Sequence, residues 1–141
     1  MHISALLTLD PLSKNDKDLW VEIYTDQATM CHIGPALSAE KAINLFEKAI
    51  ARNNNLRFTV RRNHDNKRVG MIGLKKIKGK TNAYELGVMI HRDYSNKGYS
   101  YKATQLLLTF AFEQLSVQSI VTYCNINNRG PNRISCALGF V

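Results

Sequence analysis

The chain has 141 residues, of which 45% are hydrophobic and 21% are charged, so wholesale disorder is excluded and one globular domain with its own core is expected. Nineteen Lys and Arg against eleven Asp and Glu give a net charge of +8, which suits an anionic ligand or partner without identifying one. The sequence has no run of 18 apolar residues and no signal-peptide pattern, so we expect a cytoplasmic protein. The three cysteines lack a CxxC pair and are expected to be reduced thiols: Cys31, Cys124 and Cys136.

The chain begins with a strand-like apolar segment, residues 2–9, which Asp10-Pro11 is expected to end. Two helices should follow, with Ser13 and Ser38 as their N-caps. Their apolar residues recur every three or four positions and so define one face of each helix: Leu19, Trp20, Ile23 and Tyr24 in the first, and Ala42, Ile43, Leu45, Phe46, Ala49 and Ile50 in the second.

The middle of the chain changes to the periodicity of strands. Segments 58–60, 69–77 and 84–90 are separated by turns at 63–66 and 79–82, which predicts three antiparallel strands in meander order. Basic residues gather in this region, and most are expected on the solvated side of the hairpins: Arg61, Arg62, Lys67, Arg68, Lys75, Lys76, Lys78 and Lys80.

The last part of the chain is expected to hold a long helix at about 97–114, a strand at 119–124 and a last short helix with Pro131 near its first turn and Gly139 just past its end. The complete order is then β-α-α-β-β-β-α-β-α. This order predicts an α+β fold, in which helices flank a mixed, mostly antiparallel central sheet. We expect one domain that spans residues 1–141.

Residues 84–103 are the most informative segment, because they combine a strand, a loop with Gly98 and the start of the long helix. The unpaired N–H groups and the dipole at a helix N-terminus together favour an anion. Glu85 places a carboxylate on the strand just before the loop. An anion site beside a possible base is what an enzyme needs to act with a phosphate-bearing cofactor.

Two sequence blocks carry a resemblance to a known family. The first is Glu85-Leu-Gly87 followed by Tyr94-Ser-Asn-Lys-Gly-Tyr-Ser100, and the second is Asn128 followed by residues 133–140, which end in Leu-Gly-Phe. With this order of elements, the sequence resembles the GNAT superfamily of acyl-CoA-dependent N-acyltransferases. It is most similar to the branch of ribosomal-protein alanine acetyltransferases (RimJ/RimL-like), and the similarity extends back to about Leu6.

The resemblance implies that an acetyl group moves from acetyl-CoA to a primary amine, either a protein N-terminus or a small amine, by direct attack in a ternary complex without a metal. It assigns acetyl-CoA to one strand, the loop that follows and a later asparagine: Val88, Met89, Ile90, Ser95, Asn96, Lys97, Gly98, Tyr99, Ser100 and Asn128. A backbone N–H near Val88 or Met89 would stabilise the oxyanion. Ser95 and Ser100 depart from the family's usual Gln/Arg and Gly/Ala, but the N–H donors are unaffected.

Glu85 is the candidate general base, directly or through water, because the acceptor amine must lose a proton before it attacks. Its alternative role is a strand glutamate that pairs with a lysine across the hairpin. The general acid stays open, since Pro131 cannot donate a proton, while Ser135, Tyr123 and bulk water can. Asn128 could instead be an ordinary turn residue. The histidines lack metal-ligand spacing, and none is predicted to be catalytic.

Other members of the family continue beyond the Leu-Gly-Phe block with two further strands, so the domain is expected to be short at its C-terminus. We expect a second copy of the chain to cover the edge strand in a homodimer, or the acceptor side to be open. Two alternatives remain: a basic RNA- or ribosome-associated binding module, and a catalytically degenerate CoA-binding protein. Nucleic acid is the less favoured partner, because the sequence lacks RRM, KH, zinc and helix-turn-helix patterns.

Overall fold

The computed structural model describes residues 2–4, 6–30, 34–52, 56–95, 97–115 and 117–122. Its elements are, in chain order, β1 (His2–Ile3), β2 (Leu7–Pro11), the 3-10 helix η1 (Lys14–Asp16), α1 (Lys17–Thr25), α2 (Gln27–Met30), α3 (Ala39–Ala51), β3 (Arg57–Arg62), β4 (Lys67–Lys76), β5 (Ala83–Ile90), the 3-10 helix η2 (Arg92–Tyr94), α4 (Tyr99–Gln114) and β6 (Ser119–Thr122).

The strands form one six-stranded sheet whose spatial order is the chain order, β1 to β6. Each neighbouring pair is antiparallel except β5 and β6, which are parallel. A parallel pair needs a crossover connection, and α4 lies in that connection. The predicted α+β class, with a mixed and mostly antiparallel central sheet, is confirmed.

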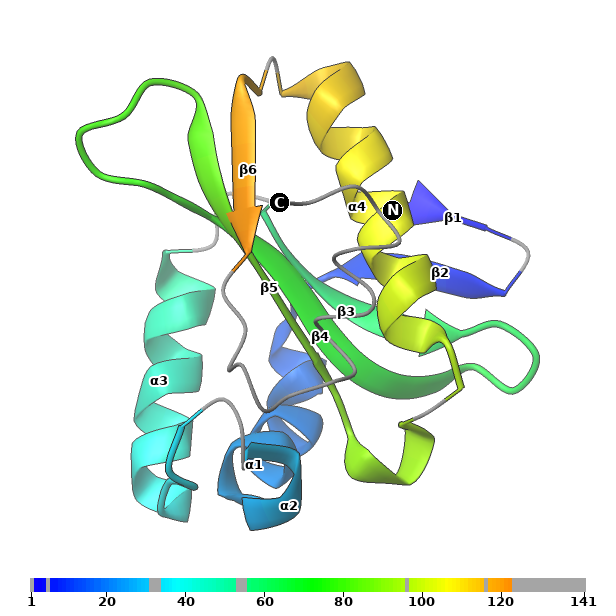
Figure 1. Cartoon of the computed structure of the whole chain (residues 1–141). Coiled ribbons are helices and arrows are strands. Elements are labelled where there is room, and N and C mark those ends of the chain that lie inside the picture. Colours follow the sequence, from blue (N-terminus) through cyan, green and yellow to red (C-terminus); the bar gives the residue numbers. More distant parts are fainter. Residues whose placement is uncertain are drawn as a thin grey trace.

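Helices cover both faces of the sheet (Figure 1). The α4 face is the larger core, formed by buried residues of α4, of β2 to β5 and of the segment before β3: Leu7, Leu9, Leu56, Phe58, Val60, Val69, Ile72, Leu74, Leu86, Tyr99, Ala103, Leu107 and Ala111. The opposite face holds α1 and α3, whose Trp20, Ile23 and Phe46 pack with Met71 of β4. Alternate residues of β5 therefore face different helices, which decides the side from which each one can be reached.

The prediction of one strand over residues 2–9 is wrong. The chain reverses after Ser4, whose hydroxyl accepts a hydrogen bond from the Leu7 N–H at 3.1 Å and donates one to the Leu7 carbonyl at 3.2 Å. Two short antiparallel strands result, and the second continues through Pro11. Proline is tolerated at a strand end, where its missing N–H costs no interior ladder bond.

The cap predicted at Ser38 is confirmed, since its hydroxyl accepts from the Lys41 N–H at 3.3 Å. The cap predicted at Ser13 is shifted by one short helix: Ser13 precedes the 3-10 helix η1, where its N–H donates to the Asp16 carboxylate at 2.8 Å, and Asp16 is the N-cap of α1. The short helix α2 was not predicted, because four residues are too few to show a helical period.

Helices α1 and α3 are joined by Trp20. Its indole N–H donates to the Ala42 carbonyl at 3.1 Å, and its ring meets Phe46 edge-on at 5.5 Å. Leu45 was predicted on the apolar face of α3 but is exposed. Ala42, Phe46 and Ala49 of the predicted face are buried and Ile43 and Ile50 are half-buried, so Leu45 is the one predicted residue that lies outside it.

The three-stranded meander and the long helix are confirmed with small shifts of their ends. The strand predicted at 119–124 is described over Ser119–Thr122, at the outer edge of the described sheet. The last two residues of that prediction, and the short helix predicted between Pro131 and Gly139, lie outside the described residues.

Gly70 allows β5 to lie close to β4. A Cβ added at Gly70 would lie 2.3 Å from the Met89 carbonyl oxygen and 2.6 Å from the Ile90 Cδ1 atom. We expect Gly70→Ala to lower the free energy of unfolding by about 1–3 kcal/mol, because the added carbon overpacks backbone that cannot move freely. Urea denaturation measures this loss. Gly87→Ala is the matched control, since its Cβ meets nothing within 4 Å; equal losses in both variants would contradict the steric explanation.

Candidate functional site

Hydrogen bonds at the two ends of β5 show which of its residues direct their backbone groups toward β4. The Ala83 carbonyl accepts a hydrogen bond from the chain at the end of β4, and the His91 N–H donates to the Val69 carbonyl of β4, each at 2.9 Å. These two positions are eight residues apart, and successive residues of a strand direct their backbone groups to opposite edges. Val88 and Ile90 therefore direct their N–H and carbonyl groups away from β4, whereas Met89 directs its own toward β4.

The other edge of β5 is paired over only half of its length by the strands that the structure describes. β6 pairs with Ala83–Leu86, and no strand within the described ranges pairs with this edge at 87–90. The predicted cofactor residues Val88, Met89 and Ile90 lie in that half, and their side chains are half-buried. The backbone groups of Val88 and Ile90 are thus placed to bind an extended chain as an added strand would.

The loop after β5 leads into the N-terminus of α4 at Gly98. Gly98 has φ 80° and ψ 9°, in the left-handed region, and a Cβ added to it would meet nothing within 4 Å. Glycine is therefore required by the backbone conformation rather than by close packing. Ser95 is exposed, and its hydroxyl donates to the Arg92 carbonyl at 2.8 Å, so this side chain stabilises its own turn.

The first turn of α4 can bind an anion through its backbone. The amides of Tyr99, Ser100 and Tyr101 begin the helix, where no carbonyl four residues earlier lies within the helix to accept from them. The first turn carries no acidic residue, and the exposed Lys97 precedes it. Tyr99 offers only its N–H, because its side chain is buried in the core. The structure thus brings this turn and the edge of β5 at residues 87–90, which no described strand pairs (the free edge of β5), to one end of the sheet (Figure 1).

Arg62 of β3 contacts this turn, although the sequence grouped it with solvated residues. Its guanidinium carbon lies 5.1 Å from the Tyr94 ring centre and 5.9 Å from the Tyr99 ring centre, and its Nη1 donates to the Tyr99 hydroxyl at 3.2 Å. Its Nη2 lies 2.6 Å from the Asp65 carboxylate. The side chain of Arg62 is only 12% exposed. No local pattern could reveal this, since the contacting tyrosines are more than 30 residues away in sequence.

The Arg62–Asp65 pair predicts a pH dependence of stability. The hydrogen bond from Arg62 holds the pKa of the Asp65 carboxyl far below its ordinary value. The unfolded chain therefore binds this proton more readily, and the contribution, complete above about pH 5, falls as the pH drops through about 4 and below. Urea denaturation between pH 3 and 6 should show a shallower acid loss for Asp65→Asn. Asp18→Asn, which alters an exposed carboxylate of α1, is the control; identical acid slopes in wild type and Asp65→Asn would contradict the prediction.

Glu85 lies half-buried on β5, opposite Lys75 of β4 and Val121 of β6. Its side chain shares a sheet face with Met89, which packs toward α1 and α3. Although Lys75 is its cross-strand neighbour, Glu85 forms no ion pair with any residue that the structure describes. The alternative role as a hairpin ion pair thus lacks support. Glu85 and Val88 are three positions apart, about 10 Å along the strand.

Carboxylates surround the junction of α1, α2 and η2. His91 is 5% exposed, and its Nε2 lies 2.9 Å from Glu22 of α1. Because the Asp93 N–H donates to Nδ1 at 3.1 Å, the ring proton lies on Nε2, which donates to Glu22. Asp26 accepts hydrogen bonds from the hydroxyl and N–H of Thr29, and the hydroxyl bond is the main cause that lowers the pKa of this carboxyl. This acidic group was not found from the sequence, because its members come from separate elements.

Several predicted positions lie outside the described residues: Asn96, Tyr123, Asn128, Pro131, Ser135, Cys31, Cys124 and Cys136. Within the described ranges, His, Cys, Asp and Glu side chains nowhere gather in a group of three that could hold a metal ion. No helix in these ranges is long and apolar enough to cross a bilayer.

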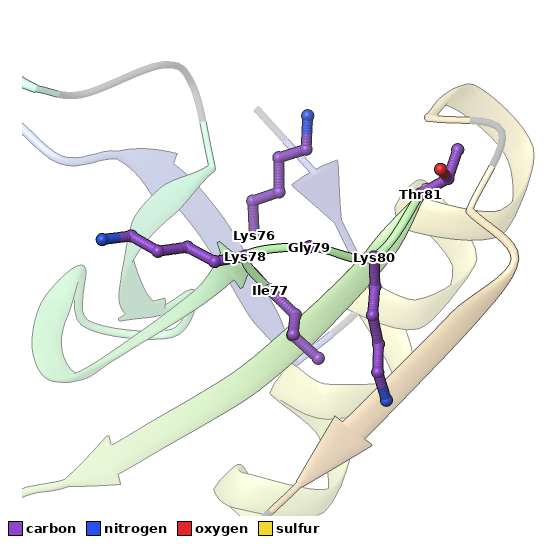
Figure 2. Close-up of a pocket in the computed structure, with 6 residues that line it drawn as sticks. All are labelled: Lys76, Ile77, Lys78, Gly79, Lys80 and Thr81. Carbon is purple, nitrogen blue, oxygen red and sulfur yellow. The ribbon is translucent and has the colours of Figure 1, made fainter.

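A shallow hollow of about 610 Å³ lies on the turn between β4 and β5, at the other end of β5 from Gly98. Figure 2 shows that the lysine side chains at its rim point in different directions rather than toward one another. The residues that line it are Lys76, Ile77, Lys78, Gly79, Lys80 and Thr81. Since these charges do not converge, the hollow is not a built anion site, and the first turn of α4 remains the candidate.

The chain is similar to known acetyltransferases over almost its whole length. A model of the acetyltransferase (GNAT) domain matches residues 7–141. A curated relative, the uncharacterized N-acetyltransferase YnaD of Bacillus subtilis (strain 168), is 25% identical over 140 residues, which are 99% of this chain and 82% of the relative.

Two solved structures are similar over almost the whole chain. A GNAT-family acetyltransferase from Bacillus anthracis has a TM-score of 0.85 and 26% identity, with 99% of this chain and 82% of that one covered. Spermidine N-acetyltransferase from Vibrio cholerae, solved with CoA and spermine, has a TM-score of 0.84 and 21% identity, with 98% and 82% covered. At 21% identity, the similarity to the spermidine N-acetyltransferase shows a shared fold and no more.

Proposed function

The chain belongs to the GNAT acetyltransferase family and is an N-acetyltransferase, and we propose from this premise how its residues divide the work. Acetyl-CoA binds along the free edge of β5 and at the first turn of α4. The acceptor amine approaches from the face that carries α1 and α3, and Glu85 takes its proton. The amine then attacks the thioester carbon of acetyl-CoA directly in a ternary complex. The C–N bond forms, the C–S bond breaks, and CoA leaves as a thiolate that takes a proton from water.

The observation that supports the cofactor site is that two kinds of backbone donor, the edge of a strand and the N-terminus of a helix, follow one another within a few residues. The free edge of β5 at Val88 and Ile90 is followed within one loop by the left-handed Gly98 and the amides of α4. An acyl-CoA needs both kinds, because its pantetheine arm carries amides and its pyrophosphate carries charge. The pantetheine amides can pair with the edge of β5 as an added strand would, and the pyrophosphate can bind at the helix N-terminus beside Lys97.

The oxyanion donor is the Val88 N–H rather than the Met89 N–H. The direction of the β4–β5 hydrogen bonds supports this choice, since Met89 uses its backbone groups toward β4. A fixed backbone donor at the thioester carbonyl stabilises the charge that develops there without any reorganisation.

Glu85 acts as general base through a water molecule. The backbone separation of about 10 Å between Glu85 and Val88 along the strand leaves room for a bridging water between the carboxylate and an amine placed at the thioester. Half-burial and the absence of an ion pair with any described residue leave the carboxylate able to accept that proton.

The acceptor is a primary amine, and we propose a protein N-terminus, as the RimJ/RimL-like resemblance implies. A polyamine is the second candidate. It is favoured by the carboxylates of Glu22, Asp26 and Asp93 on the α1 side, which would attract a polycation. The similar spermidine N-acetyltransferase was solved with spermine.

Calorimetric titration with acetyl-CoA, followed by an assay of thiol release, tests the proposal. The acceptors are an alanine-initiated peptide, the same peptide with a formylated N-terminus, and spermine. Turnover of the free peptide but not of the blocked one supports the protein acceptor, and turnover of spermine alone supports the polyamine. Absence of acetyl-CoA binding, together with salt-dependent binding to RNA, would overturn the proposal in favour of a basic binding module.

A further inference from the structure

We propose that Arg62 is a positioning residue that holds the N-terminal turn of α4, residues 98–101, in its anion-binding conformation. The inference rests on the proposed cofactor site. It assigns to a β3 residue a role in acetyl-CoA affinity, through two tyrosines and without direct contact to the cofactor.

The contacts of Arg62 bracket the turn. Tyr94 ends η2 before the turn, Tyr99 is the first residue of α4, and both rings lie within 6 Å of the Arg62 guanidinium carbon. The hydrogen bond of 3.2 Å from Arg62 to the Tyr99 hydroxyl adds a directional restraint. One side chain therefore links both ends of the connection between η2 and α4 to the sheet.

All three nitrogens of the Arg62 guanidinium donate hydrogen bonds within the protein. Its Nε and Nη2 donate to the Asp65 carboxylate at 3.1 and 2.6 Å, and its Nη1 donates to Tyr99. Each nitrogen thus has a partner within the protein, and the ring of Tyr94 lies against the guanidinium. Arg62 acts on an anion through the backbone amides that it holds in place.

The turn needs such support because Gly98 stands in its left-handed conformation without side-chain packing. An added Cβ at Gly98 would meet nothing within 4 Å, so no side-chain packing surrounds this residue, and its carbonyl accepts a hydrogen bond from the Lys102 N–H at 3.1 Å. Among the described residues, no side chain caps the helix either. A preorganised turn binds a ligand more tightly, because the cost of ordering it has been met before binding.

Arg61 provides a matched control on the same strand. It lies one residue before Arg62 and forms its own ion pair, 2.7 Å from the Asp10 carboxylate, on β2. Its side chain is 25% exposed, compared with 12% for Arg62. Removing either arginine deletes one ion pair of β3, but only Arg62 contacts the tyrosines.

The experiment compares Arg62→Met, Arg62→Lys and Arg61→Met with wild type in two measurements. Calorimetry gives the acetyl-CoA Kd, and we expect Arg62→Met to raise it about tenfold, because both cation–π contacts are lost. Arg62→Lys should bind more tightly than Arg62→Met but more weakly than wild type, since lysine keeps the positive charge but lacks the planar guanidinium with its several N–H donors. Arg61→Met should bind as wild type does.

Hydrogen exchange of residues 97–101 without cofactor is the second measurement. Arg62→Met should exchange faster there, while Arg61→Met should not, even when the two variants lose similar thermal stability. Wild-type affinity and exchange in Arg62→Met would overturn the inference. Failure of wild type to bind acetyl-CoA would overturn the proposed cofactor site instead, and the exchange data would still decide whether Arg62 orders the turn.

Discussion

Glu85→Gln is expected to lower kcat by about 10²- to 10³-fold while it leaves the acetyl-CoA Kd unchanged. Glutamine keeps the size of the side chain but cannot accept the proton that the acceptor amine must lose. The free edge of β5 at Val88 and Ile90, which we assign to the cofactor, is unaltered by this change. Steady-state kinetics with the acceptor found in the screen, together with calorimetry, measure the two quantities separately.

Two comparisons make this result specific. Glu113→Gln alters an exposed glutamate of α4 and should leave kcat at its wild-type value. Lys75→Gln alters the cross-strand neighbour of Glu85 and tests the structural alternative. A loss of activity in Lys75→Gln as large as that in Glu85→Gln would assign the effect to a hairpin ion pair rather than to a base.

Gly98→Glu is expected to weaken acetyl-CoA binding by about 100-fold. A side chain at φ 80° costs about 1–2 kcal/mol of backbone strain, and a carboxylate at the helix N-terminus repels the pyrophosphate that we place there. Calorimetry measures the affinity, and thermal denaturation measures the strain. Gly98→Ala separates the two causes, because it introduces the strain without the charge.

Gly79 supplies a close control for the same experiment. Its φ of 78° matches that of Gly98, and a Cβ added to it also meets nothing within 4 Å, but it lies on the β4–β5 hairpin. Gly79→Glu should therefore lose stability through strain and keep the affinity for acetyl-CoA. Equal losses of affinity in Gly79→Glu and Gly98→Glu would show that α4 does not hold the pyrophosphate.

Much of the fold could be predicted because its signals are local. The serine caps at Ser13 and Ser38, the turn residues of the meander and the loop glycine before α4 each act on residues within four positions. The reversal at Ser4 was missed because a hydroxyl that bonds Leu7 makes a turn without glycine or proline. Glu85 and Gly98 could be singled out for a similar reason, since strand, loop and helix follow one another in the chain.

The sequence by itself determined the fold class, the order of most elements and the family resemblance, because periodicity, caps and turn residues express short-range physics. Only the tertiary structure decided which edge of β5 is unpaired by the described strands at residues 87–90, which face carries Glu85 and which arginine contacts the start of α4. These depend on residues far apart in the chain, such as Arg62 and Tyr99, whose meeting follows from the register of the sheet and the packing of helices on it. No local pattern contains that information.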